Sequence, residues 1–142
     1  MPNLSPTEMR AWRGFLHTHS AIWKDLDAAL AEDDLSMPAY ELLLTLQEAG
    51  DAGMRMTELA RTLRFSGGGL TRLVDKLERR GSVERRRCPI DGRGFEAVLT
   101  PAGKRELRRV HAKHVRQVRA HFLDRLDPTD LEALTRVWTK LA

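Results

Sequence analysis

Three consecutive glycines stand at the point where a helical pattern begins. The segment is SGGGLTR, residues 66–72, and a glycine inside a helix costs about 1 kcal/mol relative to alanine. Free backbone N–H groups and the positive end of the helix dipole attract a phosphate at a helix N-terminus, and a backbone without side chains can approach it closely. We interpret Gly67, Gly68 and Gly69 as a phosphate-contacting backbone. The alternative is a loose helix start that contacts nothing.

Side chains that could read or hold a polyanion follow directly. An arginine can donate two hydrogen bonds to guanine O6 and N7, which makes Arg72 the first candidate for a base contact. Thr71 and Ser66 could contact a phosphate or a thymine methyl. Residues 72–93 hold eight basic and four acidic groups, whereas residues 1–50 hold three and eight. This local positive charge indicates a polyanion site, although a solvated helix face would give the same pattern.

Other chemistry finds little support in the sequence. The glycines match no nucleotide-binding loop, and no strand pattern precedes them. His111, His114 and His121 share one side of a predicted helix and could form a metal site with His17 or His19. Because no carboxylate set accompanies them, we expect core or interface histidines instead. We therefore expect no catalytic residue, no metal and no cofactor, and we do not expect an enzyme.

The composition is that of a globular protein, with 142 residues, 42% of them hydrophobic and 31% charged. No apolar run approaches the roughly 20 residues of a membrane span, and the N-terminus lacks a signal pattern. Cys88 is the only cysteine, which excludes an internal disulfide and agrees with a reducing compartment. We expect a cytoplasmic protein without membrane contact.

The elements that must position these residues are mostly helices. Caps and apolar periodicity predict helices over residues 6–30, 37–49, 57–63, 67–80, 101–126 and 128–141. After Gly81 the period changes to two, which predicts a β-hairpin with strands 83–87 and 95–99. A short helix, a turn and a second helix followed by a hairpin is a winged helix. The predicted fold class is mainly α with a small β-hairpin wing (α+β).

The terminal helices carry long apolar stripes that the winged helix does not cover. Trp12, Leu16, His19 and Trp23 recur along the first helix at three- and four-residue steps. Stripes of this length need a partner, and a second copy of the chain is the economical one. Aromatic groups around one polar side chain would also suit a planar acid or phenol. Core packing is the alternative interpretation of the same stripe.

The order of elements and several local strings resemble the MarR family of bacterial transcription regulators. The matching strings are Leu-Ser at 35–36, TELA at 57–60, LTRLVDKLERRG at 70–81, DGR at 91–93 and LTPAG at 99–103. The resemblance implies a homodimer that binds double-stranded DNA at near-palindromic operators, usually as a repressor. It also implies release of DNA by a small aromatic or phenolic effector. The winged helix-turn-helix would span residues 36–100, and residues 5–35 and 101–142 would form the helical dimerisation region.

The resemblance also adds residues to the predicted sites. It implies that Arg93 in the wing enters the minor groove and that Asp91 fixes its direction, while Arg86 is expected to contact phosphate. The predicted DNA-contacting residues are Ser66, Gly67, Gly68, Gly69, Thr71, Arg72, Lys76, Arg86, Asp91 and Arg93. The predicted effector-binding residues are Trp12, Leu16, His19, Trp23, Tyr40 and Met56. A protein-interaction module that does not read DNA remains the alternative function.

Overall fold

A computed structural model describes residues 3–88, 92 and 94–141 of the chain. The helices are α1 (Pro6–Ala31), α2 (Met37–Ala49), α3 (Met56–Thr62), α4 (Gly67–Arg79), α5 (Pro101–His121) and α6 (Pro128–Leu141), the short 3-10 turns are η1 (Gly50–Ala52) and η2 (Leu123–Arg125), and the strands are β1 (Met54–Arg55), β2 (Val83–Arg87) and β3 (Phe95–Leu99). The chain is therefore mainly helical with a small sheet, as the sequence predicts.

Side-chain caps set most helix starts where the sequence predicts them. Ser5 and Glu8 form a reciprocal capping box at α1. The Ser36 Oγ accepts from the Ala39 N–H at the start of α2, and the Thr100 Oγ1 accepts from the Gly103 N–H at the start of α5. Each such cap satisfies a backbone donor that the helix itself leaves free.

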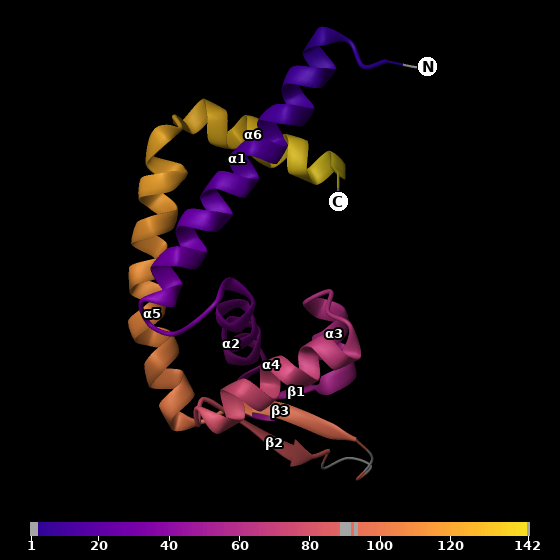
Figure 1. Ribbon diagram of the computed structural model, residues 1–142, viewed down its shortest axis with the longest axis vertical. Coiled ribbons are helices and arrows are strands. Elements are labelled where there is room, and N and C mark those ends of the chain that lie inside the picture. Colours follow the sequence, from indigo (N-terminus) through magenta and orange to yellow (C-terminus); the bar gives the residue numbers. More distant parts are fainter. Residues whose placement is uncertain (1–2, 89–91, 93, 142) are drawn as a thin grey trace.

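The core surrounds α2. The fully buried side chains from α2, α3 and α4 are Leu42, Leu43, Leu46, Leu59, Leu70, Val74 and Leu77, and α5 contributes Val110. The lower half of α1 packs along α5 beside α2, while α3, α4 and the sheet form a separate lobe around the other side of α2 (Figure 1). The winged helix is thereby carried at one end of the long helices.

The sheet has three strands instead of the predicted two. Its order is β1-β3-β2, and both pairs are antiparallel. In β3 the alternation that a period of two implies is absent: Phe95 is 49% exposed, whereas the next four residues, Glu96 included, are all buried. The physical reason is that β3 is the central strand and that Glu96 lies directly opposite Arg86, whose guanidinium pairs with it at 3.3 Å.

The end of α5 is another difference from the prediction. The sequence predicts a helix to residue 126, but α5 ends at His121, and Phe122 leaves the helical region with φ −135° and ψ −67°. The chain then reverses, so that α6 crosses α1 (Figure 1). Trp138 of α6 lies against Phe15 of α1 there, with ring centroids 6.1 Å apart.

The outer part of α1 and the C-terminal part of α6 have large apolar side chains in solvent. Trp12, Phe15, His19 and Trp23 form a ladder along α1 with ring centroids 5.7–6.1 Å apart. None of the residues of α6 is fully buried. No helix among the described residues is both long and apolar enough to cross a membrane.

Candidate nucleic-acid interface

The N-terminus of α4 is exposed and free of side chains. The Ser66 Oγ accepts from the Gly69 N–H at 3.2 Å, which caps the helix. Within the described part of the chain, no acceptor takes the N–H groups of Gly67 and Gly68. Free N–H groups at the positive end of a 13-residue helix form a site suited to an anion.

Packing within the chain does not require glycine at two of the three positions. A Cβ added at Gly67 or Gly68 would meet nothing within 4 Å, whereas one at Gly69 would lie 3.1 Å from the Ser66 Oγ and 3.3 Å from the Phe65 Cδ1. None of the three glycines has a positive φ. The bare backbone at 67 and 68 is thus unexplained by the fold itself, which favours contact with something outside the chain.

The exposed face of α4 carries cations at helical spacing. Arg72 and Lys76 are exposed, as is Arg79, which the sequence-based list of contacts omits. The spacing of 72, 76 and 79 places all three on one side of the helix, and this was the signal that could have identified Arg79. The Thr71 Oγ1 bonds back to the Gly67 carbonyl and the Arg72 Nε to the Gly68 carbonyl, so both side chains lie along the first turn.

Asp75 of α4 pairs with an arginine of the wing. Its carboxylate accepts from the Arg85 Nη1 at 2.6 Å, and the Glu78 carboxylate accepts from the same nitrogen at 2.5 Å. Arg85 also donates to the Thr71 carbonyl at 3.0 Å. Arg85 therefore joins β2 to α4 and holds the wing against the helix that carries the exposed cations.

The next arginine, Arg86, turns to the opposite side of the strand. Its Nη2 donates to the carbonyl oxygens of Asp51 and Ala52 at 2.8 and 2.5 Å, and its Nε pairs with Glu96. The predicted phosphate contact of Arg86 stays a prediction, but its guanidinium is already bonded within the chain. Arg87 is exposed and lies over the Phe95 ring at 6.0 Å, which makes it the arginine of this strand that is free to reach outward.

The tip of the wing is only partly described. Asp91 and Arg93, the predicted minor-groove pair, lie outside the described residues. Gly92 and Gly94 have φ values of +64° and +77°, a region that favours glycine and agrees with a tight loop.

The predicted effector residues do not meet in one chain. Trp12, Leu16 and Trp23 are 53%, 43% and 38% exposed, and His19 is exposed on the same helix. Tyr40 is buried and contacts α5 instead, and no contact brings Met56 to the α1 aromatic ladder.

Tyr40 belongs to a small polar cluster between α2 and α5. Its hydroxyl lies 2.7 Å from the His111 Nδ1, and its ring lies 4.2 Å from that of His114. Burial lowers the pKa of His114, and the positive charge that His111 can carry lowers it further. Burial also raises the pKa of Tyr40. Both shifts favour the neutral forms of His114 and Tyr40 at the contact between the two helices.

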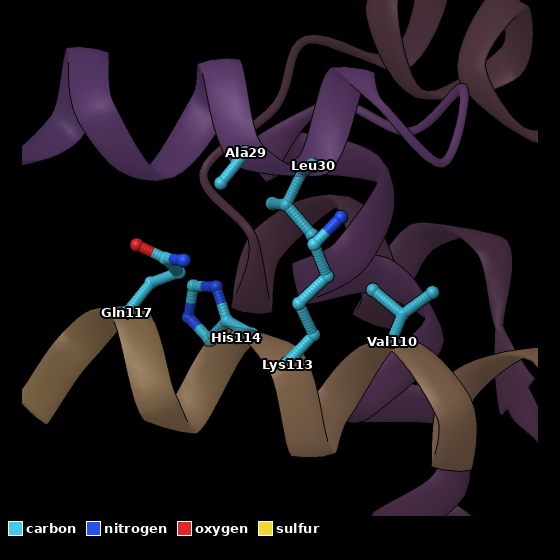
Figure 2. Close-up of a pocket in the computed structure, with 6 residues that line it drawn as sticks. All are labelled: Ala29, Leu30, Val110, Lys113, His114 and Gln117. Carbon is cyan, nitrogen blue, oxygen red and sulfur yellow. The ribbon is translucent and has the colours of Figure 1, made fainter.

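Hollows near this cluster do not form an effector site with the predicted residues. The gap between α1 and α5 is lined by Ala29, Leu30, Val110, Lys113, His114 and Gln117 (Figure 2), and it is too narrow to admit a water molecule. An open surface groove of about 370 Å³ between α2 and the end of α3 includes none of the six predicted residues.

The remaining candidate chemistry is weak. Among the described residues, no three metal-ligating side chains are close enough to hold an ion. Cys88 is buried, with its Sγ 3.4 Å from the Glu96 Oε1. Neither observation adds a second site to the α4 surface.

Comparison with known proteins agrees with this geometry. The sequence profile described as "MarR family" matches residues 33–94. AbsC, a MarR family transcriptional regulator from Streptomyces coelicolor, is 34% identical, with a TM-score of 0.91 over 99% of this chain and 95% of AbsC. Sco3205, a MarR family transcriptional regulator from the same organism solved in complex with DNA, is 33% identical, with a TM-score of 0.92 over 99% of this chain and 89% of Sco3205.

A curated relative gives a shorter match. The transcriptional repressor MprA of Escherichia coli (strain K12) is 30% identical over 95 residues, which are 67% of this chain and 54% of MprA. The match thus spans about half the length of that protein. AbsC and Sco3205 are matched over nearly their whole length, with the same arrangement of long helices and winged helix. On this ground, the chain belongs to the MarR family of transcription regulators.

Proposed function

We propose that this protein binds a pseudo-palindromic DNA operator as a homodimer and represses transcription from it. The observation that carries the proposal is the exposed N-terminus of α4, where Gly67 and Gly68 leave the backbone bare without any internal packing reason. Support comes from Sco3205, which was solved with DNA, and from MprA, which is a repressor.

In the proposed complex α4 enters the major groove. A backbone phosphate binds the N–H groups of Gly67 and Gly68, and Ser66 and Gly69 support it through the cap. Arg72 reaches a base edge because its Nη groups make no bond within the described chain. Thr71, Lys76 and Arg79 contact phosphate, which positions the helix without reading sequence. The predicted roles of Asp91 and Arg93 in the minor groove complete the proposal.

The long helices supply the twofold axis. Residues 5–35 and 101–142 form the dimerisation region in this proposal, and residues 36–100 form the DNA-binding region. The exposed aromatic ladder of α1 and the exposed apolar residues of α6 support association, because contiguous apolar surface of this kind marks an interface. Two copies of α4 would then meet successive major grooves about 34 Å apart.

The predicted aromatic effector is placed at that interface. Trp12, Leu16, His19 and Trp23 lie on the surface that a second copy would cover. A planar acid or phenol would bind between the copies, where two α1 helices enclose the exposed rings. Tyr40 lies between α2 and α5, and Met56 lies at the start of α3. These two residues belong to the effector prediction only if this part of one chain approaches the α1 rings of the other copy in the dimer.

The test is a fluorescence-anisotropy titration against the intergenic DNA beside the protein's own gene and against a scrambled duplex. Phosphate contacts release counterions, so binding should weaken by about 10³-fold or more between about 50 and 200 mM salt. We expect the intergenic duplex to bind more tightly at both salt concentrations. Equal, weak binding to both duplexes would contradict the proposal and favour the protein-interaction module.

A further inference from the structure

Arg80 ends the recognition helix α4 and connects it to two other parts of the chain. Its Nε and Nη2 donate to the Glu106 Oε1 of α5 at 2.8 and 2.5 Å. Its Nη1 donates to the Asp34 carboxylate and carbonyl at 2.8 and 3.0 Å, and its Nη2 also donates to the Asp33 carbonyl at 2.7 Å. One guanidinium therefore joins α4, α5 and the turn between α1 and α2.

These contacts form a partly buried junction around the Arg80 guanidinium. The Arg80 side chain is only 24% exposed and that of Glu106 only 14%. The hydrogen bond that Arg80 donates to Glu106 raises the pKa of the guanidinium above its ordinary value, which favours its charged form. Asp34 holds a φ of +57°, which turns its carbonyl toward Arg80 and which aspartate tolerates better than most residues. A fork of five donors in fixed geometry suits three acceptor residues, and a lysine would keep only part of these contacts.

The backbone around the junction is equally constrained. The second oxygen of Glu106, Oε2, accepts from the Ser82 Oγ at 2.5 Å, and the Thr100 Oγ1 donates to the Gly81 carbonyl at 2.6 Å. A Cβ at Gly103 would lie 2.0 Å from the Ser82 carbonyl oxygen. Only glycine lets the first turn of α5 approach this closely. The residues directly after α4 are thus clamped onto α5.

The turn between α1 and α2 is tied to α5 a second time. Asp33 accepts from Arg109, and from the Lys113 Nζ at 3.2 Å, and both donors lie on α5. These hydrogen bonds lower the pKa of the Asp33 carboxyl, with the bond from Arg109 as the largest cause. The turn at Asp33 and Asp34 therefore has its own attachment to α5, and among the described residues Arg80 is the side chain that hydrogen-bonds this turn to the end of α4.

We propose that Arg80 is a positioning residue that sets the distance and angle between the two recognition helices of the dimer, and so selects the spacing between operator half-sites. This inference rests on the proposed function. Each added base pair moves a half-site by about 3.4 Å and rotates it by about 34°. A recognition helix fixed rigidly to the dimerisation helices can match one spacing only. A helix released at this end can adapt to neighbouring spacings.

The experiment measures binding of the full-length protein to a set of duplexes that carry the operator with the wild-type spacer, one base pair fewer and one more. The test variant is Arg80→Met with Glu106→Gln, which removes the ion pair without leaving a buried carboxylate unpaired. The matched control is Arg119→Met with Asp124→Asn, which removes an exposed ion pair between the end of α5 and the turn η2. Circular dichroism and light scattering check folding and dimer mass for each.

We expect wild type and the control pair to bind the altered spacings about tenfold more weakly or worse. The Arg80→Met, Glu106→Gln protein should discriminate by less than about threefold, while its affinity for a duplex with one half-site stays unchanged. Arg80→Lys should be intermediate. A merely structural role would lower the affinity for all duplexes equally and leave the ratio intact.

The outcomes separate this inference from the proposed function. If wild type binds these duplexes no more tightly than a scrambled duplex, the proposed function fails. If wild type prefers the operator duplexes to the scrambled one but shows no preference among the spacings, only the spacing inference fails. If wild type prefers one spacing and the junction variant keeps the full preference, only the role of Arg80 is overturned. Should the double variant not fold, Glu106→Gln and Arg80→Lys alone decide: a graded loss of spacing preference supports the inference, and an unchanged ratio overturns it.

Discussion

The substitution Gly68→Ala is expected to stabilise the protein and to weaken DNA binding. Gly68 has an ordinary helical φ, and a Cβ there would meet nothing within 4 Å. Alanine in place of a helical glycine contributes about 0.5–1 kcal/mol to the free energy of unfolding. For a chain of this size that corresponds to a rise in Tm of about 1–4 °C.

Binding should change in the opposite direction. If a phosphate approaches the bare backbone of α4, an added methyl group displaces it and one charge-assisted hydrogen bond is lost or lengthened. We expect a loss of about tenfold in affinity, equivalent to about 1.4 kcal/mol. Gly69→Ala is the informative neighbour, because its Cβ would press on the Ser66 Oγ at 3.1 Å and disturb the cap. That variant should gain little or no stability.

The assay combines thermal unfolding at fixed protein concentration, since a dimer's Tm depends on concentration, with anisotropy titration on the operator duplex. Gly14→Ala is the control. Gly14 also has open space for a Cβ but lies on α1, so Gly14→Ala should raise Tm without changing the affinity for the operator duplex. The reasoning is refuted if Gly68→Ala raises Tm and binds DNA as tightly as wild type. The glycines would then be only a loose helix start.

Further variants test the other parts of the site. Arg72→Ala should relax discrimination at one base pair by about 1–3 kcal/mol, measured on duplexes with single-base changes; uniform weakening on all of them would instead identify a phosphate contact. Because burial lowers the pKa of His114, the unfolded chain takes up its proton at a higher pH than the folded chain does. The free energy of unfolding should therefore fall as pH drops below about 6.5, and denaturant titrations of His114→Gln should show a smaller fall; an equal fall would exclude this histidine as its source. Trp12→Asp should halve the mass seen by light scattering, and an unchanged dimer would place the interface elsewhere. Arg87→Gln should make the slope of log affinity against log salt shallower by about two per dimer. Arg86→Gln should lower Tm and leave this slope unchanged; a shallower slope with an unchanged Tm would instead support Arg86 as a phosphate contact.

The parts of the fold that the sequence predicts well are those decided within one turn of chain. A serine or threonine cap accepts from a backbone N–H only three residues later, so the cap is a local arrangement. Ser66 and Thr100 therefore begin α4 and α5 at the positions that the sequence predicts. β1 could not be predicted, because two residues show no alternation. Glu96 is buried because it pairs with Arg86, which lies on the neighbouring strand and ten residues away in sequence, whereas Phe95 is exposed. The sequence of β3 alone could not predict this pairing.

The same distinction decides what a run of basic residues can do. The sequence shows eight cations between residues 72 and 93 and gives no sign of which are already neutralised. In the folded chain Arg80, Arg85 and Arg86 pair with carboxylates that lie 7–46 residues away in sequence or across the sheet. Their charge holds α4 and the wing in place, and what remains exposed on the described part of this segment is the row on α4 and Arg87. A count of basic residues therefore overstates the number of unpaired cations in this segment, and the paired arginines fix the position of the helix and strand that carry the exposed ones.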